Sequence, residues 1–161
     1  MMDDSAGLTL LELLIALSVL LILQCIAVPA WRHLIMTNRT QAIIDRIKMA
    51  INITRIEAVL QHHVMRLCAS ADHKTCRGNW RDGQLIQNPA TGEVLRSYPR
   101  LPTGYRLMWR SAFQRNHYLD FNAQGFTQGQ QGTFYCCIDR DPQYSRGLVV
   151  SQSGRVRELQ E

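Results

Sequence analysis

Three residues in one short polar segment could bind a metal ion, namely Cys68, His73 and Cys76. Cysteine and histidine are common zinc ligands, but this segment lacks the short Cys-x-x-Cys spacing and a convincing fourth ligand. In an oxidising compartment, two cysteines that bracket a polar loop pair as a disulfide far more often than they bind metal. We therefore predict a disulfide between Cys68 and Cys76 and no metal site.

The sequence has none of the short motifs that mark common enzyme sites, such as a Gly-rich phosphate loop, Gly-x-Ser-x-Gly or His-Glu-x-x-His. His62 and His63 are neighbours that project about 100° apart on a helix, so they cannot easily serve one ligand set. Cys136 and Cys137 are also adjacent, and their pairing stays open because a bond between them would be strained. We expect a binding protein rather than an enzyme, with no cofactor.

A basic motif near the C-terminus could bind phosphate. Arg155 and Arg157 follow Gly154, and side chains two residues apart project together if the segment is extended. The guanidinium fork matches two phosphate oxygens, and the backbone N–H groups of a Ser-Gly turn could add donors. Two solvated arginines at a chain end would explain the same residues. Arg146 and Arg140 lie near enough in sequence to extend the basic patch.

The charge of the chain is unevenly distributed. All 18 lysines and arginines lie after Ala30, together with 10 of the 13 acidic residues, so this part carries a formal charge of +8. A charge of this size favours an anionic partner, which could be nucleic acid, lipid head groups or acidic protein. The length of 161 residues allows one domain, and the composition excludes a disordered chain or a coiled coil.

The segment from Leu8 to Ala30 is almost entirely apolar and is long enough to cross a bilayer as a helix. A secretory signal peptide would need a basic front and a small-x-small cleavage site, which are absent here. Glu12 is the one acidic residue in this apolar segment. A carboxylate inside a spanning helix raises the free energy of membrane insertion by about 2.5–3.5 kcal/mol. We therefore expect a partner for Glu12 from a chain terminus or from another subunit.

The elements that position these residues follow from hydrophobic periodicity. Apolar residues spaced by three and four after Pro29 predict an amphipathic helix to about Leu67, and Pro29 itself is expected to bend or open the helix. Short alternating segments separated by turn residues then predict an antiparallel β head, so the fold class is α+β. The predicted strands are Gln84 to Ile86, Val94 to Tyr98, Tyr105 to Trp109, Tyr118 to Phe121, Thr133 to Ile138 and Leu148 to Ser151.

The residues from Gly7 to Leu17 resemble the class III signal of type IV prepilins and pseudopilins. The resemblance implies that a prepilin peptidase cuts after Gly7 and N-methylates Leu8, where phenylalanine is usual. It also supplies the missing partner, because the family's glutamate, here Glu12, faces the α-amino group of a neighbouring subunit during filament assembly. The leader carries two aspartates and Arg32 follows the apolar segment, which is opposite to the positive-inside expectation, so orientation depends on the resemblance alone.

The pilin resemblance implies three parts. Residues 1–7 are a leader peptide, residues 8–30 a transmembrane and assembly helix, and residues 31–161 a periplasmic head in which the helix packs on the β head. The implied precursor is a single-pass protein of the bacterial inner membrane. It is then assembled into a pilus with other major and minor pilins.

The segment from Arg55 to Gly83 is similar to the GspH/FimT branch of pilin-like proteins, which shows a Cys-loop-Cys followed by Trp-x-x-Gly after the first helix. Gly154, Arg155 and Arg157 match the Gly-Arg-x-Arg tail of the FimT minor pilins, which are implicated in DNA binding during natural transformation. The resemblance implies a minor pilin that binds DNA without sequence specificity. The alternatives are a GspH-like minor pseudopilin of a type II secretion system, with a structural role and no DNA binding, and a pilus-assembly initiator.

Overall fold

The computed structural model describes residues 9–112, 117–139 and 141–159, except the side chains of residues 141–144. In these residues one helix, α1 (Leu10–Leu60), is followed by eight strands. The strands in chain order are β1 (Met65–Ala69), β2 (Gln84–Gln87), β3 (Val94–Tyr98), β4 (Tyr105–Ser111), β5 (Tyr118–Phe121), β6 (Gly132–Ile138), β7 (Asp141–Val150) and β8 (Val156–Leu159). The chain divides into two compact units at Thr37 and Asn38.

The described part of the first unit is the beginning of α1. Its apolar side chains, such as Leu11, Ile15 and Leu20, are exposed. α1 is long and apolar enough, by length and composition, to cross a membrane. The helix is continuous through Pro29, so the predicted opening does not occur. A proline removes one backbone hydrogen bond, and the neighbouring turns keep theirs.

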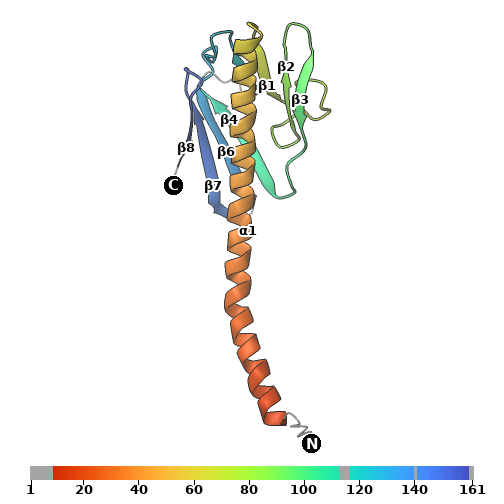
Figure 1. The fold of residues 1–161 in the computed structure, drawn as a ribbon, viewed down its shortest axis with the longest axis vertical. Coiled ribbons are helices and arrows are strands. Elements are labelled where there is room, and N and C mark those ends of the chain that lie inside the picture. The colour runs from red at the N-terminus through yellow and green to blue at the C-terminus, as the bar shows by residue number, and fades with distance from the viewer. Residues whose placement is uncertain (1–8, 113–116, 140, 160–161) are drawn as a thin grey trace, which may run out of the picture. The chain divides into compact units, whose positions relative to one another are not determined.

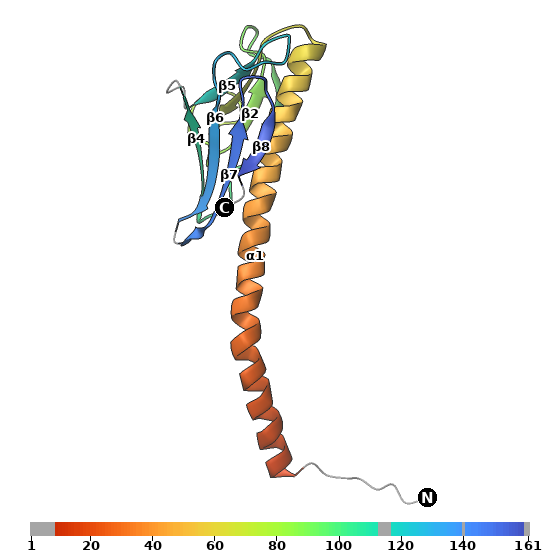
Figure 2. The same ribbon diagram turned by 90° about the vertical axis from the view of Figure 1, so that its left-hand side faces the viewer.

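The second unit, Asn38–Glu161, is referred to below as the head. It holds the end of α1 and two four-stranded antiparallel sheets, ordered β3-β2-β1-β5 and β4-β6-β7-β8. Figures 1 and 2 show the end of α1 lying along the strands. In Figure 2, β8 is the strand of the second sheet next to α1. The predicted α+β fold, with a long helix packed on an antiparallel β head, is confirmed.

One apolar core joins the helix and both sheets. The helix contributes fully buried isoleucines at the spacing that the amphipathic pattern predicts, including Ile44, Ile47 and Ile51. The second sheet contributes Phe134, whose ring lies 4.9 Å from that of Trp80 in an edge-to-face arrangement. This contact packs β6 against the segment between β1 and β2, where Trp80 lies.

The helix is shorter than predicted. It ends at Leu60 instead of about Leu67, because His62 adopts a left-handed backbone with φ of 55° that terminates a helix. The residues that follow form β1, where Leu67 is buried between β2 and β5. The predicted strands correspond to β2 to β7, and most of their ends shift by no more than two residues. The exception is β7, which begins at Asp141 and not at Leu148, and β1 and β8 are not predicted.

The disulfide expected between Cys68 and Cys76 is present. It closes a loop in which the Asp72 carboxylate accepts hydrogen bonds from the backbone N–H groups of Thr75 and Lys74, at 2.8 and 3.0 Å. These hydrogen bonds hold the pKa of Asp72 well below its usual range, and the bond from Thr75 has the largest effect. The loop is therefore fixed by a covalent bond and by a charged turn.

Candidate nucleic-acid interface

A tight turn between β7 and β8 presents the basic motif. The backbone N–H of Ser151 donates to the carbonyl of Arg155 at 3.0 Å, and the Ser151 hydroxyl accepts from the N–H of Arg155 at 3.2 Å. The N–H of Gly154 donates to the carbonyl of Ser151 at 2.9 Å. The serine thus uses its backbone and its side chain to fix the point at which Arg155 leaves the turn.

Gly154 is required by this turn for two reasons. It is buried with φ of 74°, a left-handed conformation that glycine adopts without strain. A Cβ at this position would also lie 2.6 Å from the carbonyl oxygen of Gly125, 3.1 Å from Arg55 Nε and 3.1 Å from Phe121 Cε1. The glycine of the motif therefore has a structural role, which is to let the turn pack closely on α1 and β5.

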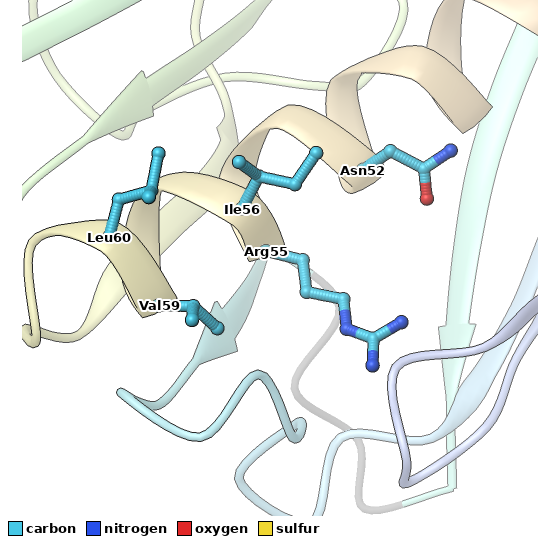
Figure 3. A pocket seen from close by; sticks show the side chains of 5 residues that line it. All are labelled: Asn52, Arg55, Ile56, Val59 and Leu60. Atoms are coloured by element: carbon cyan, nitrogen blue, oxygen red, sulfur yellow. The ribbon is translucent and has the colours of Figure 1, made fainter.

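Arg55 was not singled out from the sequence, yet it lies against Gly154. Figure 3 shows its side chain extending from α1 beside Asn52, Ile56, Val59 and Leu60, which line a surface pocket of about 380 Å³. Its helical spacing from the buried Ile51 and Ala58 could have placed it at the edge of the packed face, but only the fold brings it to the tail.

Arg155 and Arg157 are both exposed, and the structure brings them together as predicted from their spacing. Together with Val149, Ser151 and Ser153 they line a surface hollow of about 360 Å³. Neither guanidinium forms an ion pair with a carboxylate among the described residues. Two uncompensated cations beside a hollow rich in hydroxyl groups are suited to binding an anion.

The next residue of β8 faces the opposite way. Glu158 accepts hydrogen bonds from Lys48 Nζ at 2.7 Å and from Gln41 Nε2 at 3.3 Å, both on α1. The bond with Lys48 lowers the pKa of Glu158 and raises the pKa of Lys48. The acidic residue that follows Arg157 in the sequence is thus engaged by the helix and forms no ion pair with Arg157.

Arg146 lies on the opposite face of the sheet from Arg155 and Arg157, because successive residues of a strand point to alternate faces. It lies opposite the buried Cys136 and is two residues from the buried Leu148, so it is on the face of β7 that looks towards the core. Its charge also lowers the pKa of Glu158, which points the same way. Arg157 pairs with Val149 on the other face. The structure therefore does not place Arg146 in the basic patch, and Arg140 lies outside the described residues.

The comparisons with known proteins agree on the family. A family model described as Type II transport protein GspH matches residues 44–154, and a second, described as Prokaryotic N-terminal methylation motif, matches residues 2–23. The chain belongs to the GspH family. Among curated proteins, none matches the sequence.

Two proteins with solved structures are similar to this chain in fold. The type IV minor pilin FimU of Pseudomonas aeruginosa superposes with a TM-score of 0.62 at 23% identity, over 74% of this chain and 87% of that chain. The minor pseudopilin EpsH from the Type 2 Secretion System of Vibrio cholerae superposes with a TM-score of 0.55 at 12% identity, over 75% and 95%. Family and fold identify the chain as pilin-like, and the apolar part of α1 is, by length and composition, sufficient to cross a membrane.

The structure of this GspH-family chain describes the methylation motif only from Thr9 onwards. Gly7 and Leu8, the predicted cleavage and methylation positions, lie outside the described residues. The N–H of Glu12 donates to Thr9 Oγ1 at 3.3 Å, so Thr9 caps the helix. The Thr-x-x-Glu spacing of a capping box predicts this contact. The Glu12 carboxylate is exposed, which leaves it accessible to a partner from another chain.

Two free cysteines lie in β6, and in the part of the chain that the structure describes no group of three or more His, Cys, Asp or Glu residues could hold a metal ion. Burial raises the pKa of the free thiol Cys136 to about 12, so this thiol stays protonated at neutral pH. Cys137 is also unbonded.

Proposed function

We propose that this protein is a minor type IV pilin that binds DNA without sequence preference and so helps a pilus to take up DNA in natural transformation. The observation that carries the proposal is the exposed pair Arg155 and Arg157, which have no carboxylate partner among the described residues and lie beside a hollow lined by hydroxyl groups. Phosphate oxygens are acceptors of matching geometry, and contacts with phosphate carry no sequence information.

The mechanism is binding and release, not catalysis. Each neutralised phosphate should reduce log affinity by about 0.9 per log unit of salt, so a grip of two arginines is weak and salt-sensitive. Weak binding suits a filament that must release its bound DNA after retraction. Several heads in one filament would hold a long DNA molecule by avidity.

The assembly part of the proposal concerns the N-terminus. A prepilin peptidase would cut after Gly7 and methylate Leu8, and the exposed Glu12 carboxylate would pair with the α-amino group of a neighbouring subunit. This pairing would offset the cost of a carboxylate in the bilayer. The precursor would reside in the bacterial inner membrane with its head in the periplasm.

DNA binding can be tested on the full chain in a non-ionic detergent, with a fluorescent duplex at several salt concentrations. The Arg155→Gln/Arg157→Gln variant should lose most of its affinity, and the salt slope should fall by about 1.8 for two lost phosphate contacts. The matched control is Arg96→Gln/Arg100→Gln, which removes the same charge from exposed positions at and after β3 of the other sheet. Equal behaviour of the two variants would contradict the proposal.

The second candidate is a minor pseudopilin of a type II secretion system, which the description of the matching family model favours. It assigns Arg155 and Arg157 no role beyond solubility. A wild-type chain that shows no salt-dependent binding to DNA would favour this alternative.

A further inference from the structure

The outer face of the β4-β6-β7-β8 sheet carries a second basic position in line with the tail. The strand register aligns Arg110 with Thr133, Thr133 with Val149, and Val149 with Arg157. Directly paired residues of antiparallel strands share one face of the sheet. Arg110 and Arg157 therefore lie in a single row that crosses all four strands, one at each edge.

The separation of these two arginines follows from the sheet geometry. Neighbouring strands lie about 4.8 Å apart, so three strand spacings put the backbones at Arg110 and Arg157 about 14 Å apart. Figure 2 shows the four strands side by side, with β8 next to α1 and β4 farthest from it. Both arginine side chains are exposed.

The row between the two arginines is uncharged. Thr133 and Val149 are partly buried, and the adjoining row across the strands contains Tyr135 and Gly147. A polyanion lying on this face would meet no carboxylate in these two rows. Gly147 is buried, because the uncharged side chain of Leu159 lies 2.7 Å from the position that its Cβ would take.

The Arg110 guanidinium is held in place without losing its charge. It lies 5.5 Å from the centre of the Tyr135 ring, a cation–π contact that orients a cation but does not neutralise it. Arg106, four residues earlier on β4, is instead ion-paired with Asp139. Arg110 forms no ion pair with any described residue.

We propose that Arg110 is a second phosphate anchor, so that a DNA duplex lies across this sheet with one backbone on Arg155 and Arg157 and the other on Arg110. This inference rests on the proposed function. The major groove of B-DNA is about 12 Å wide, close to the separation of the two edges of the sheet. The sheet face would carry the duplex by its backbones, which agrees with binding that ignores base sequence.

The test measures the affinity of the full chain in non-ionic detergent for a 20-base-pair duplex as a function of salt. Arg110→Gln should weaken binding about five- to tenfold near 0.1 M salt and reduce the salt slope by about 0.9. Arg110→Lys keeps a point charge and should restore most of the slope. The matched control is Arg96→Gln, which removes one exposed charge from β3 in the other sheet.

The outcomes separate this inference from the proposed function. If the tail double variant loses binding while Arg110→Gln behaves like Arg96→Gln, the inference is overturned and the proposed function stands. If Arg110→Gln weakens binding and the tail variant does not, the anchor stands and the proposed role of the tail fails. If the wild-type chain does not bind the duplex, both fail. Unchanged melting of Arg110→Gln excludes unfolding as the cause of a loss.

Discussion

Replacing Gly154 by alanine tests whether the glycine of the basic motif acts through the turn and not through DNA. The residue has φ of 74°, and a Cβ there would lie 2.6 Å from the Gly125 carbonyl oxygen. Gly92 offers a matched control, because its φ of 75° is nearly the same and nothing lies within 4 Å of its Cβ position. The two variants share the backbone strain, and only Gly154→Ala adds a steric conflict.

The expected free energies of unfolding follow from these two terms. A left-handed backbone costs an alanine about 1–2 kcal/mol, which applies to both variants. Forcing a methyl group against a packed carbonyl oxygen adds about 1–3 kcal/mol at Gly154. We therefore expect Gly92→Ala to lose about 1–2 kcal/mol and Gly154→Ala about 2–5 kcal/mol of stability.

Thermal unfolding of the full chain in non-ionic detergent, followed by tryptophan fluorescence, measures both losses. Trp80 and Trp109 are buried in the head and report on its unfolding. For a unit of this size we expect a fall in Tm on the order of 10–20 °C for Gly154→Ala and about 4–8 °C for Gly92→Ala. Gly154→Ala should also weaken DNA binding with Arg155 and Arg157 intact. Equal falls in Tm for the two variants would refute the steric argument.

Three further predictions concern other parts of the chain. Cys68→Ala/Cys76→Ala opens a loop with a sequence separation of 8 and should cost about 2–3 kcal/mol, measured by urea unfolding against the wild type. Hydrogen bonds depress the pKa of Asp72, so its contribution to stability is present above the unfolded pKa of about 4 and is lost as the pH falls below it. The difference in the free energy of unfolding between wild type and Asp72→Ala should therefore narrow from about pH 5 to about pH 2, measured by urea unfolding at each pH. Mass spectrometry of the native product should show a chain that begins with N-methylated Leu8, and a product that retains Gly7 would contradict the assembly proposal.

The sequence predicts the helix and most strands because their periodicity is strong and local. The buried face of α1, with Ile44, Ile47 and Ile51, is the one that the spacing indicates. The end of the helix is not predictable in this way, because residues 61–67 continue without proline or glycine. The left-handed backbone at His62 and the pairing of β1 between two other strands decide it, and both depend on tertiary structure.

Strand β8 escaped prediction because it is short, charged and at an edge. Four residues give no clear alternation of apolar and polar types, and edge strands commonly carry charges that discourage pairing with other chains. What fixes β8 is its ladder with β7 and the contact from Lys48 to Glu158, which are 110 residues apart. A contact over that sequence distance leaves no trace in the local pattern.

The candidate site could be predicted only where its geometry is local. Arg155 and Arg157 share a face because they are two residues apart on an extended segment, which the sequence shows directly. Whether Arg146 joins them depends on the register of β6, β7 and β8, and that register turns it towards the core. The same register brings Arg110 into line with Arg157 from 47 positions earlier in the chain.

The alternation along β8 explains how a tail of nearly balanced charge can present a positive surface. Read along the sequence, Glu158 follows Arg157 directly and would cancel one positive charge. In the structure Glu158 turns to the helix side, where Lys48 and the nearby Arg146 compensate it. A carboxylate engaged on the far side of the sheet contributes little to the field at the outer face, since solvent-exposed charges beyond about 8–10 Å are largely screened. The alternation of side chains along β8 therefore places Glu158, which binds the strand to α1, on one face and Arg157, which remains available to phosphate, on the other.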